Sequence, residues 1–552
     1  MIKSQLKRLV DRCFEKGTQQ GLWTDAAAGN YTVEVPKHEG QGAFSTNFSL
    51  VVAGKEKRNP REIAAQFVEL LESEESFVNK LEIAGPGFIN FFLADSIWSS
   101  VLAPIHDQGE RFGLSDTGKG MKVMVEFVSA NPTGPLSVGH GRNAILGDTV
   151  SRLLEAVGYD VSREYYFNDA GRQMRVLGAS TKARYLERLE LPSEFPEDGY
   201  QGDYIYDIAQ SIIDESGDSL KNTDEMVFKD RAKDAIFADI DKTLQRIGIK
   251  FDTYYNEHSL YEEGLIDDVV AELRAKDLVY EKEGATWFKT TEFGQEQDRV
   301  IIKSTGEPTY RLPDIAYHRE KFRRGFEWMI DIFGSDHIAT VPDVMAGIQA
   351  LGYDTSKVHV LLYQFVVTLM RGGKQVKMST RKATFVTVDE LVDEVGVDAL
   401  RFFFLMRKPD NMIEFDLDLA TKQSQENPVY YVQYAYARLC SIERQASEQG
   451  VQTAGVGKLD LSQLVEPEEY NLLKIMADYP VLVEGAARDL APHRIIFYFI
   501  ELAGQFHSFY NKHKVLGDNS ELTQARMYLC GALKIVIGNG LHLVGLTAPE
   551  KM

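Results

Sequence analysis

The 552-residue sequence has only three cysteines, and none of them forms a CxxC pair. This scarcity excludes a disulfide framework and a cysteine-based zinc site. Long apolar runs are also missing, because the longest, such as residues 358–370, are interrupted by His and Gln or too short to cross a bilayer. Residues 1–17 have the pattern of a basic amphipathic helix rather than a signal peptide. We therefore expect a cytoplasmic protein without bound zinc or a membrane anchor.

Positive charge is scarce as well, since 61 Lys and Arg residues face 82 Asp and Glu residues and leave a net charge of −21. Nonspecific nucleic-acid binding is therefore disfavoured, although a local basic face stays possible. Lys3, Lys7, Arg8, Arg12 and Lys16 form such a cluster, which a solvated helix face explains about as well. The 44% of apolar residues suffice for packed cores. The length predicts roughly three or four domains.

Standard nucleotide fingerprints are absent or met only formally. No GxxxxGK[ST] phosphate loop occurs, and residues 139–144 match the dinucleotide pattern GxGxxA by letter alone. In dinucleotide folds the first glycine follows its strand closely, whereas here about ten residues intervene and no acidic residue is placed for the ribose. A nicotinamide enzyme is therefore disfavoured.

The chain does contain a loop between a strand and a helix that suits a phosphate. Residues 121–128 (MKVMVEFV) predict a buried parallel strand, and apolar residues recur at helical spacing from 146 to 157. Residues 130–140 between them are rich in Gly and Pro. The free N–H groups and positive end of a helix attract phosphate at such a junction, so these residues predict a nucleotide site.

The order of predicted elements indicates three domains. Residues 1–115 predict a small α+β domain, with strands over 31–35, 44–52 and 87–93 and a helix over 61–71. Residues 116–415 predict an α/β fold, a Rossmann-type doubly wound parallel sheet interrupted by an insertion over about 171–320, with its last strand over 358–367. Residues 416–552 predict an all-α bundle.

Two motifs in this frame resemble the signature loops of arginyl-tRNA synthetases, a family of class I aminoacyl-tRNA synthetases. SANPTGPLSVGHGRNAILGD is similar to the HIGH-type loop, here residues 130–140, and RGGKQVKMSTR to the KMSKS loop, here 377–381. The likeness extends to EYYFNDAGRQM, VDELVDEVGVDALRFFFLMR, ENPVYYVQYAYARLCSI and the terminal GLTAPEKM. It implies an arginine–tRNA ligase that uses ATP with Mg²⁺, L-arginine and tRNA, and works as a cytoplasmic monomer.

The resemblance also implies which residues form the site. The reacting phosphates would be held by His140, Ser137, Lys377 and Ser379. ATP would further contact Pro132, Gly139, Asn143, Gly334, Asp336, His337 and Met378. Arginine would be bound by Glu126, Asn131, Tyr310 and Asp314, since acceptor groups can clamp the planar donor fork of a guanidinium. A strand-end charge at Glu126 and a helix cap at Asp314 are the structural alternatives.

Transfer RNA would contact both terminal domains. The candidate contacts are Phe88, Asn90 or Phe91 in the first domain and Tyr430, Tyr434 and Arg438 in the last, because unpaired bases stack on aromatic rings. Core packing explains the same aromatic positions. The C-terminal bundle would receive the anticodon.

The sequence departs from the family pattern at two positions. Ser137 stands for the first signature histidine and Thr380 for the second KMSKS lysine, while Gly134 occupies the place of a compensating lysine. Losing one unreplaced transition-state donor costs about 2.7–4 kcal/mol. A noncatalytic tRNA-binding relative of the same fold is therefore the rival hypothesis.

Overall fold

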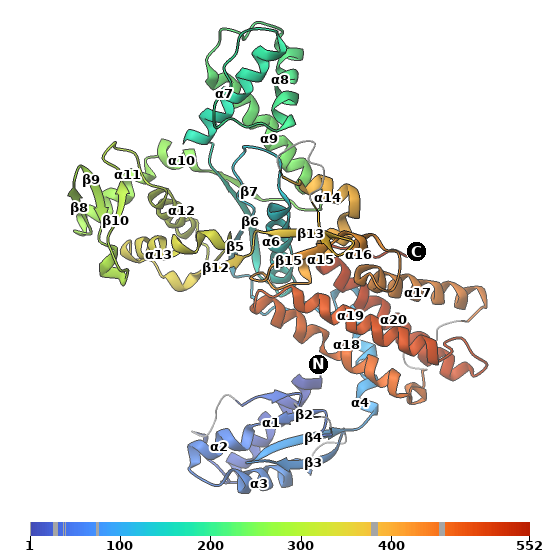
Figure 1. Ribbon diagram of the computed structural model, residues 1–552. Helices are drawn as coiled ribbons and strands as arrows, with labels where there is room; N and C mark the ends of the chain where they lie inside the picture. The colour runs from blue at the N-terminus through green and yellow to red at the C-terminus, as the bar shows by residue number, and fades with distance from the viewer. Residues whose placement is uncertain are drawn as a thin grey trace.

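The computed structural model describes residues 2–25, 31–36, 38, 40–72, 77–169, 171–376, 385–451 and 459–552. The N-terminal domain lies at one end of the molecule, beside the C-terminal helices (Figure 1). The parallel sheet lies on the other side of these helices, and two further lobes project from it (Figure 1).

A five-stranded, fully parallel sheet forms the centre, with the order β12-β11-β5-β6-β7. Its strands are β5 (Lys122–Glu126), β6 (Asp160–Phe167), β7 (Thr253–Asn256), β11 (Trp328–Gly334) and β12 (Val358–Tyr363). The chain order reverses between β5 and β11, and ligands bind at such a switch point, outside the carboxyl ends of the strands. Helix α6 (Val138–Ala156) begins there. The predicted doubly wound sheet is confirmed.

Close packing fixes α6 against the sheet. Strand β5 is buried from Val123 to Glu126, and most of α6 is buried as well. A Cβ at Gly147 would lie 2.1 Å from the ring of Phe127, so only glycine lets the helix approach this closely. The first turn of α6 is thereby held at the switch point.

The predicted insertion is divided in two by β7, a strand that the sequence did not reveal because it has only four residues. The first part is helical: α7 (Gly171–Arg188), α8 (Asp203–Ser216) and α9 (Glu225–Arg246). The second part contains α10 (Glu257–Glu262), α11 (Leu265–Ala275), β8 (Val279–Lys282), β9 (Ala285–Phe288), β10 (Arg299–Ile302) and α12 (Arg311–Arg323). Helix α12 leads into β11, which is followed by η4 (Ser335–Ala339) and α13 (Val341–Ala350).

The N-terminal domain packs helices against a four-stranded sheet of order β1-β2-β4-β3. It comprises α1 (Ile2–Gln19), β1 (Val33–Glu34), β2 (Phe44–Thr46), α2 (Phe48–Glu56), α3 (Pro60–Glu72), β3 (Val78–Ala84) and β4 (Phe88–Leu93). The predicted strand over 44–52 is wrong beyond Thr46, because helix α2 follows directly. Helices α4 (Ser96–Ser99) and α5 (Leu102–Gln108) then lie against α18 and α20 of the last domain.

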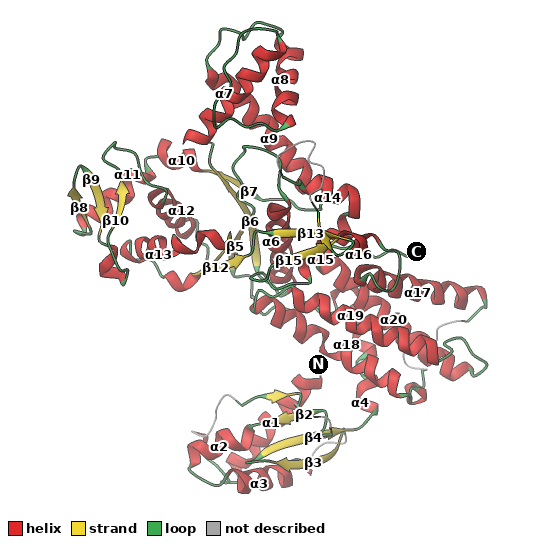
Figure 2. Cartoon of the chain, in the orientation of Figure 1, coloured by secondary structure: helices red, strands yellow, loops and turns green. Residues whose placement is uncertain are grey.

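The C-terminal domain is helical, as predicted (Figure 2). Its main helices are α17 (Pro428–Glu448), α18 (Pro467–Arg488), α19 (His493–Lys512) and α20 (Ser520–Leu543). Between sheet and bundle lie β13 (Val367–Arg371), β14 (Lys374–Gln375), α14 (Val388–Val395), α15 (Val397–Leu405), β15 (Ile413–Asp416) and α16 (Leu417–Thr421). The strand predicted over 358–367 is therefore two strands, β12 and β13, in different sheets.

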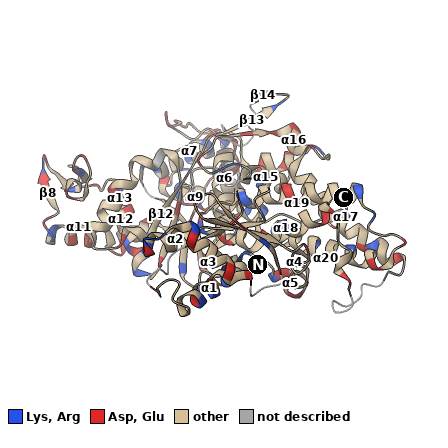
Figure 3. Cartoon of the chain, turned by 90° about the horizontal axis from the view of Figure 1, so that it is seen from below, with Lys and Arg blue, Asp and Glu red and all other residues tan. Residues whose placement is uncertain are grey.

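The distribution of charged and apolar side chains over the described residues agrees with helices that bury one face and expose the other. Basic and acidic residues are intermixed over the helices in the view from below (Figure 3). On α1, Leu6, Leu9 and Cys13 are buried, whereas Arg8 and Arg12 are exposed. Among the described helices, none combines the length and apolar character that a bilayer crossing requires.

Candidate functional site

The first turn of α6 is organised by Ser137 and His140. Ser137 is the N-cap, and its Oγ accepts a hydrogen bond from the main-chain N–H of His140 (3.4 Å). In return, the main-chain N–H of Ser137 donates to His140 Nδ1 (3.2 Å), and Ser137 Oγ lies 3.1 Å from the same nitrogen. Burial lowers the pKa of His140 to about 4. The imidazole is therefore uncharged at neutral pH.

Gly139 lets the first turn of α6 lie close to the main chain at Phe365. A Cβ there would lie 2.6 Å from the carbonyl oxygen of Phe365. The Phe365 ring stands edge-on to His140 with centroids 5.1 Å apart, and it is 39% exposed. Phe365 therefore offers an open aromatic face next to the start of α6.

Arg142 holds this segment in place. Its guanidinium is 2% exposed and donates to the carbonyl oxygens of Gln364 (2.6 Å), Lys408 (3.0 Å), Pro409 (3.1 Å) and Asn411 (2.7 Å). Burial lowers its pKa to about 10, so the group stays charged. The result is a buried cation, bonded to carbonyl groups, in the second turn of α6.

The first signature loop is joined through the main chain to residues 386–388, the segment that leads into α14. Val138 N donates to Val386 O (3.1 Å), Val388 N donates to Leu136 O (2.9 Å), and Ser137 and Thr387 form an antiparallel bridge. Thr387 is itself the N-cap of α14. The starts of α6 and α14 therefore lie side by side.

A cavity of about 380 Å³ opens at the first loop, lined by Asn131, His140, Tyr204 and Phe385 among others. A Cβ at Gly134 would lie 3.1 Å from the hydroxyl of Tyr204, which donates to Thr133 O (2.7 Å). The helical part of the insertion thus covers the place of the compensating lysine.

Glu126, at the end of β5, belongs to a buried ionic cluster. Its carboxylate is 2% exposed and accepts from Lys321 Nζ (2.6 Å) and Ser129 Oγ (3.0 Å). Lys321 Nζ also donates to Asp331 (2.6 Å). Burial raises the pKa of Glu126 against the opposing effect of Lys321. The alternative of a solvent-facing strand end is therefore wrong.

His318 completes this cluster. Its Nε2 faces the Asp331 carboxylate (2.9 Å), and its Nδ1 faces the main-chain oxygen of Asp314 (2.8 Å). Both partners are acceptors, so the ring links Asp331 to the start of α12. Lys321 is the cation that the two carboxylates Glu126 and Asp331 share.

Asp314 is the carboxylate left without a counterion. Among the described residues its side chain has no hydrogen-bond or ion-pair partner, and it is half-buried. Burial raises its pKa to about 7; the charges of His318 and Lys321 oppose this rise, and those of Glu257 and Glu126 add to it. Glu257 accepts from Tyr166 Oη (2.7 Å) and Asn168 Nδ2 (2.9 Å). The N-cap of α12 is Tyr310, so the capping alternative for Asp314 is wrong. We call the region outside the carboxyl ends of β5 and β11, from the start of α6 to Asp314, the crevice. Its Asp314 end suits a cationic, hydrogen-bond-donating ligand.

The remaining predicted ligand-binding residues of the crevice differ in solvent exposure. Asn131 is exposed, and its amide bonds Gln173 Oε1 (2.9 Å) and Asn168 N (3.2 Å). Tyr310 is 56% exposed, one turn before Asp314 on α12. Pro132 is buried in the loop, and Gly334 ends β11 beside the switch point.

Asn143 points into the sheet rather than into the crevice. Its Oδ1 accepts from Val128 N (2.9 Å), and its Nδ2 donates to Ile332 O (3.0 Å). It thereby bridges the segment after β5 to β11. Val128 (φ 65°) and Ser129 (φ 43°) are both left-handed, and Ser129 Oγ accepts from Tyr166 N (3.2 Å). The contacts with Asn143 on one side and Tyr166 on the other keep Val128 and Ser129 in this strained backbone conformation.

Some predicted site residues fall outside the described part. Lys377, Met378 and Ser379 lie in the stretch 377–384, which is not described. Asp336 and His337 lie in η4, and their side chains are likewise outside the described set. Their predicted roles stay predictions.

The N-terminal tRNA candidates separate clearly by burial. Phe91 is fully buried in the domain core, so the packing alternative holds for it. Asn90 is 4% exposed, whereas Phe88 is 39% exposed at the start of β4. Only Phe88 of the three presents a substantial open surface.

The C-terminal candidates form one continuous stack along α17. The rings of Tyr430 and Tyr434 are parallel with centroids 5.9 Å apart, and Tyr434 also stacks on His507. The Arg438 guanidinium lies over the rings of Tyr434 (4.7 Å) and Tyr510 (4.5 Å). Tyr430 and Tyr434 are half-buried, so each ring combines packing with an accessible edge.

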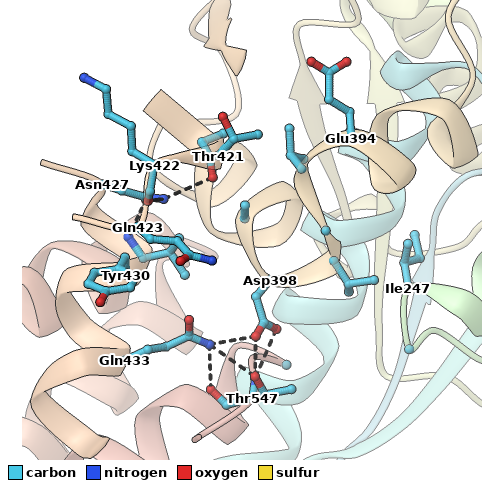
Figure 4. A pocket seen from close by; sticks show the side chains of 18 of the residues that line it. Ile247, Glu394, Asp398, Thr421, Lys422, Gln423, Asn427, Tyr430, Gln433 and Thr547 are labelled. Atoms are coloured by element: carbon cyan, nitrogen blue, oxygen red, sulfur yellow. Dashed lines mark hydrogen bonds between the residues drawn. The ribbon is translucent and has the colours of Figure 1, made fainter. Parts of the chain in front are cut away.

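Tyr430 also lines a cavity of about 870 Å³ between the end of α9, helices α14 to α17 and the chain terminus (Figure 4). Asp398 accepts from Gln433 Nε2 (2.7 Å) and from Thr547 N (3.1 Å) on its wall. The GLTAPEKM terminus is thereby tied to the start of α15.

Sequence reasoning missed the residues that act through long-range contacts. Lys321, Glu257 and Phe365 reach the crevice from separate segments, and none has a local motif that marks its role. Arg142 lies within the first motif, but its carbonyl partners are far along the chain and the motif does not reveal them. The surroundings of Lys321 and Glu257 are polar, so neither residue has a local sign in the sequence.

Comparisons with known proteins agree along the whole chain. Residues 2–93 match the family model "Arginyl tRNA synthetase N terminal domain", 105–416 match "tRNA synthetases class I (R), catalytic domain", and 432–552 match "DALR anticodon binding domain". The "Arginine--tRNA ligase" of Desulfotalea psychrophila is 65% identical over 553 residues and covers 100% of both chains.

Two solved structures show the same fold. The putative arginyl-tRNA synthetase of Campylobacter jejuni has a TM-score of 0.77 at 34% identity and covers 83% of this chain and 100% of its own. The Thermus thermophilus arginyl-tRNA synthetase has a TM-score of 0.75 at 22% identity, with 100% of both chains covered.

Proposed function

The chain belongs to the arginyl-tRNA synthetase family, and from this premise we propose how its crevice carries out the reaction. The protein is an ATP-dependent ligase that joins arginine to tRNA. The observation that supports our assignment of the crevice is the uncompensated Asp314 carboxylate at the switch point where α6 begins.

Arginine binds at the acidic end of the crevice. Its guanidinium pairs with Asp314, beside the Glu126 cluster and Tyr310, and Asn131 receives the α-amino group. The added cation provides the counterion that Asp314 lacks, so binding and ionisation of this carboxyl favour each other. Lysine presents a point charge rather than a planar fork and fits such a site less well.

ATP binds as its Mg²⁺ complex at the start of α6. The positive end of the helix dipole faces the triphosphate there, with Pro132, Gly139 and Gly334 lining the approach. His140 and Ser137 form the phosphate-binding turn, and Asn143 keeps β5 and β11 at the correct separation. Lys377, Met378, Ser379, Asp336 and His337 contribute from the second loop and from η4.

The reaction proceeds in two steps. An arginine carboxylate oxygen attacks the α-phosphorus of ATP, the bond to the bridging oxygen breaks, and pyrophosphate leaves with that electron pair. A terminal ribose hydroxyl of tRNA then attacks the acyl carbon, AMP leaves, and the hydroxyl proton is released. Positioning and charge stabilisation account for the catalysis in both steps.

Transfer RNA spans both terminal domains. Phe88, whose strand β4 also holds the buried Asn90, belongs to the N-terminal contact. Tyr430, Tyr434 and Arg438 belong to the contact with the anticodon arm. The protein acts as a monomer in the cytoplasm. A base stacked on such a ring contributes about 1–3 kcal/mol, so Tyr434→Ala raises the KM for tRNA more than Tyr434→Phe does.

Arginine charging with purified protein tests this assignment. We expect incorporation of arginine into tRNA, and ATP–pyrophosphate exchange measured with tRNA present. No charging under any condition would favour the noncatalytic tRNA-binding relative, which the full-length match to ligases disfavours. Charging with another amino acid would contradict the role of Asp314.

A further inference from the structure

The proton on His140 is fixed by its surroundings. The main-chain N–H of Ser137 points at His140 Nδ1 from 3.2 Å. A main-chain N–H can only donate, so the nitrogen that faces it has to be an acceptor without a proton. The neutral ring therefore carries its proton on Nε2.

Ser137 Oγ strengthens this arrangement. It lies 3.1 Å from Nδ1 and accepts the main-chain N–H of His140 at 3.4 Å, so its own proton is free to point at Nδ1. Nδ1 thus receives two donors from one residue. Among the described residues Nε2 has no hydrogen-bond partner, and His140 lines the 380 Å³ cavity of the first loop.

We propose that Ser137 is a positioning residue, which caps α6 and holds His140 as the tautomer whose Nε2–H donates to a phosphate oxygen. The inference rests on the proposed phosphate-binding role of His140. It replaces the expectation that Ser137 contacts phosphate directly, since both hydrogen-bonding functions of its hydroxyl are used on His140.

The neutral tautomer has a catalytic advantage. A neutral donor stabilises negative charge that develops on the phosphate without forming an ion pair that would retain pyrophosphate. Burial keeps the pKa of His140 at about 4, so the ring stays a neutral donor throughout the physiological range.

Substitutions at 137 separate helix capping from control of the proton. Ser137→Thr keeps both functions and Ser137→Ala removes the hydroxyl. Ser137→Asp keeps a good N-cap but places an anionic acceptor beside Nδ1, which draws the proton to that nitrogen. Asp and Thr both cap helices, so we expect Ser137→Asp and Ser137→Thr to fold like the wild type.

The test is long-range ¹H–¹⁵N NMR of the full-length protein labelled at its 11 histidines, without substrates at pH 7. Comparison with His140→Gln assigns the signal of His140. We expect the Nε2–H pattern in the wild type and in Ser137→Thr, a smaller share of that tautomer in Ser137→Ala, where the main-chain N–H is the one donor left to Nδ1, and a proton on Nδ1 in Ser137→Asp. A wild-type ring protonated on Nδ1, or an unchanged pattern in Ser137→Asp, overturns the proposal.

The kinetic test follows pyrophosphate exchange in the same variants, with tRNA present. We expect kcat to fall about tenfold in Ser137→Ala and further in Ser137→Asp, with the KM for arginine unchanged and Ser137→Thr close to the wild type. An unchanged kcat in Ser137→Asp contradicts the proposal. Wild-type protein with the Nε2–H tautomer but no arginine charging would instead overturn the proposed function.

Discussion

The two ends of the crevice are built by opposite means. At the start of α6, the main chain and neutral groups prepare the site: a capped helix, an uncharged His140 and the close approach of Gly139 to Phe365. At the ends of β5 and α12, buried ions do so, with Lys321 opposing Glu126 and Asp331 while Asp314 stays uncompensated.

This difference shows how one site distinguishes its two substrates. A triphosphate brings several negative charges and needs donors that do not hold the product too tightly. Arginine brings one cation, and a single spare carboxylate in a low-dielectric setting selects it. The four changes below test this division.

Breaking the ionic cluster is expected to have the largest effect. Lys321→Met leaves Glu126 and Asp331 buried without their shared cation, and such losses cost about 3–5 kcal/mol of unfolding free energy. Urea denaturation measures the change. Lys303→Met is the control, because its pair with Glu307 is exposed, and should change stability by no more than about 0.5 kcal/mol. Equal free energies of unfolding for the two variants would mean that the ion pairs of Lys321 do not stabilise the fold.

Asp314→Asn is expected to lower kcat/KM for arginine about a hundredfold, because removing one partner of a buried charge pair costs about 2–5 kcal/mol. Charging kinetics at saturating ATP give this ratio. Asp234→Asn makes the same chemical change on an exposed face of α9 and should have no effect. A rise in the KM for ATP alone would assign Asp314 to the other end of the crevice.

Gly139→Ala tests the end built by the main chain. The added Cβ meets the carbonyl of Phe365 at 2.6 Å, and such overpacking costs about 1–3 kcal/mol. We expect the KM for ATP to rise about tenfold while the KM for arginine stays constant. Gly54→Ala is the control, since the same change on α2 meets nothing within 4 Å and should be neutral or stabilising. An unaffected KM for ATP would show that this packing does not shape the nucleotide site.

The pH dependence should differ between the two substrates. Asp314, with a pKa of about 7, loses its charge as the pH falls from 8 to 6, so the KM for arginine rises, by at most about tenfold per pH unit below 7. His140 does not titrate in this range, because its pKa is about 4. Asp314→Asn should abolish the dependence. A variant that retains the wild-type slope would place the titrating group elsewhere.

The same pKa shift predicts a stability effect of known sign. In the folded protein without arginine, Asp314 binds its proton up to about pH 7, whereas the unfolded chain releases it near the ordinary value. The contribution of Asp314 to the free energy of unfolding therefore falls as the pH rises from about 4 to about 7. Thermal melts at pH 8 should show a higher Tm for Asp314→Asn than for the wild type, and a lower Tm would contradict the assigned pKa shift.

The sequence predicted the framework well where its periodicity was long. The strand before the first motif lies near its predicted bounds, and the last domain is helical as predicted. Helix α6 contains the residues with the predicted helical spacing but begins earlier, at Val138. It failed where elements were short or context decided them, as with the four residues of β7 and the helix after Thr46.

The sequence likewise predicted those site residues that lie in local motifs and missed those that only the fold brings to the site. Glu126, Asp314, Ser137 and His140 could be predicted as site residues because they lie in or near motifs. Lys321 lies 195 residues from Glu126 along the chain, and only the fold brings the two together. The orientation of Asn143 into the sheet could not be read from sequence either, because an amide near a helix start suits a ligand and a main chain equally.

Val128 and Ser129, the two residues with left-handed backbone conformation after β5, affect how substitutions in this segment are tolerated. Val128 is a β-branched residue at φ 65°, where glycine would be relaxed. Glycine at 128 would relieve this backbone strain, but it would also remove a side chain that is only 6% exposed and packed in the core. The buried isopropyl group and the contacts of Asn143 and Ser129 therefore hold the chain after β5 in a conformation that its own residue type disfavours.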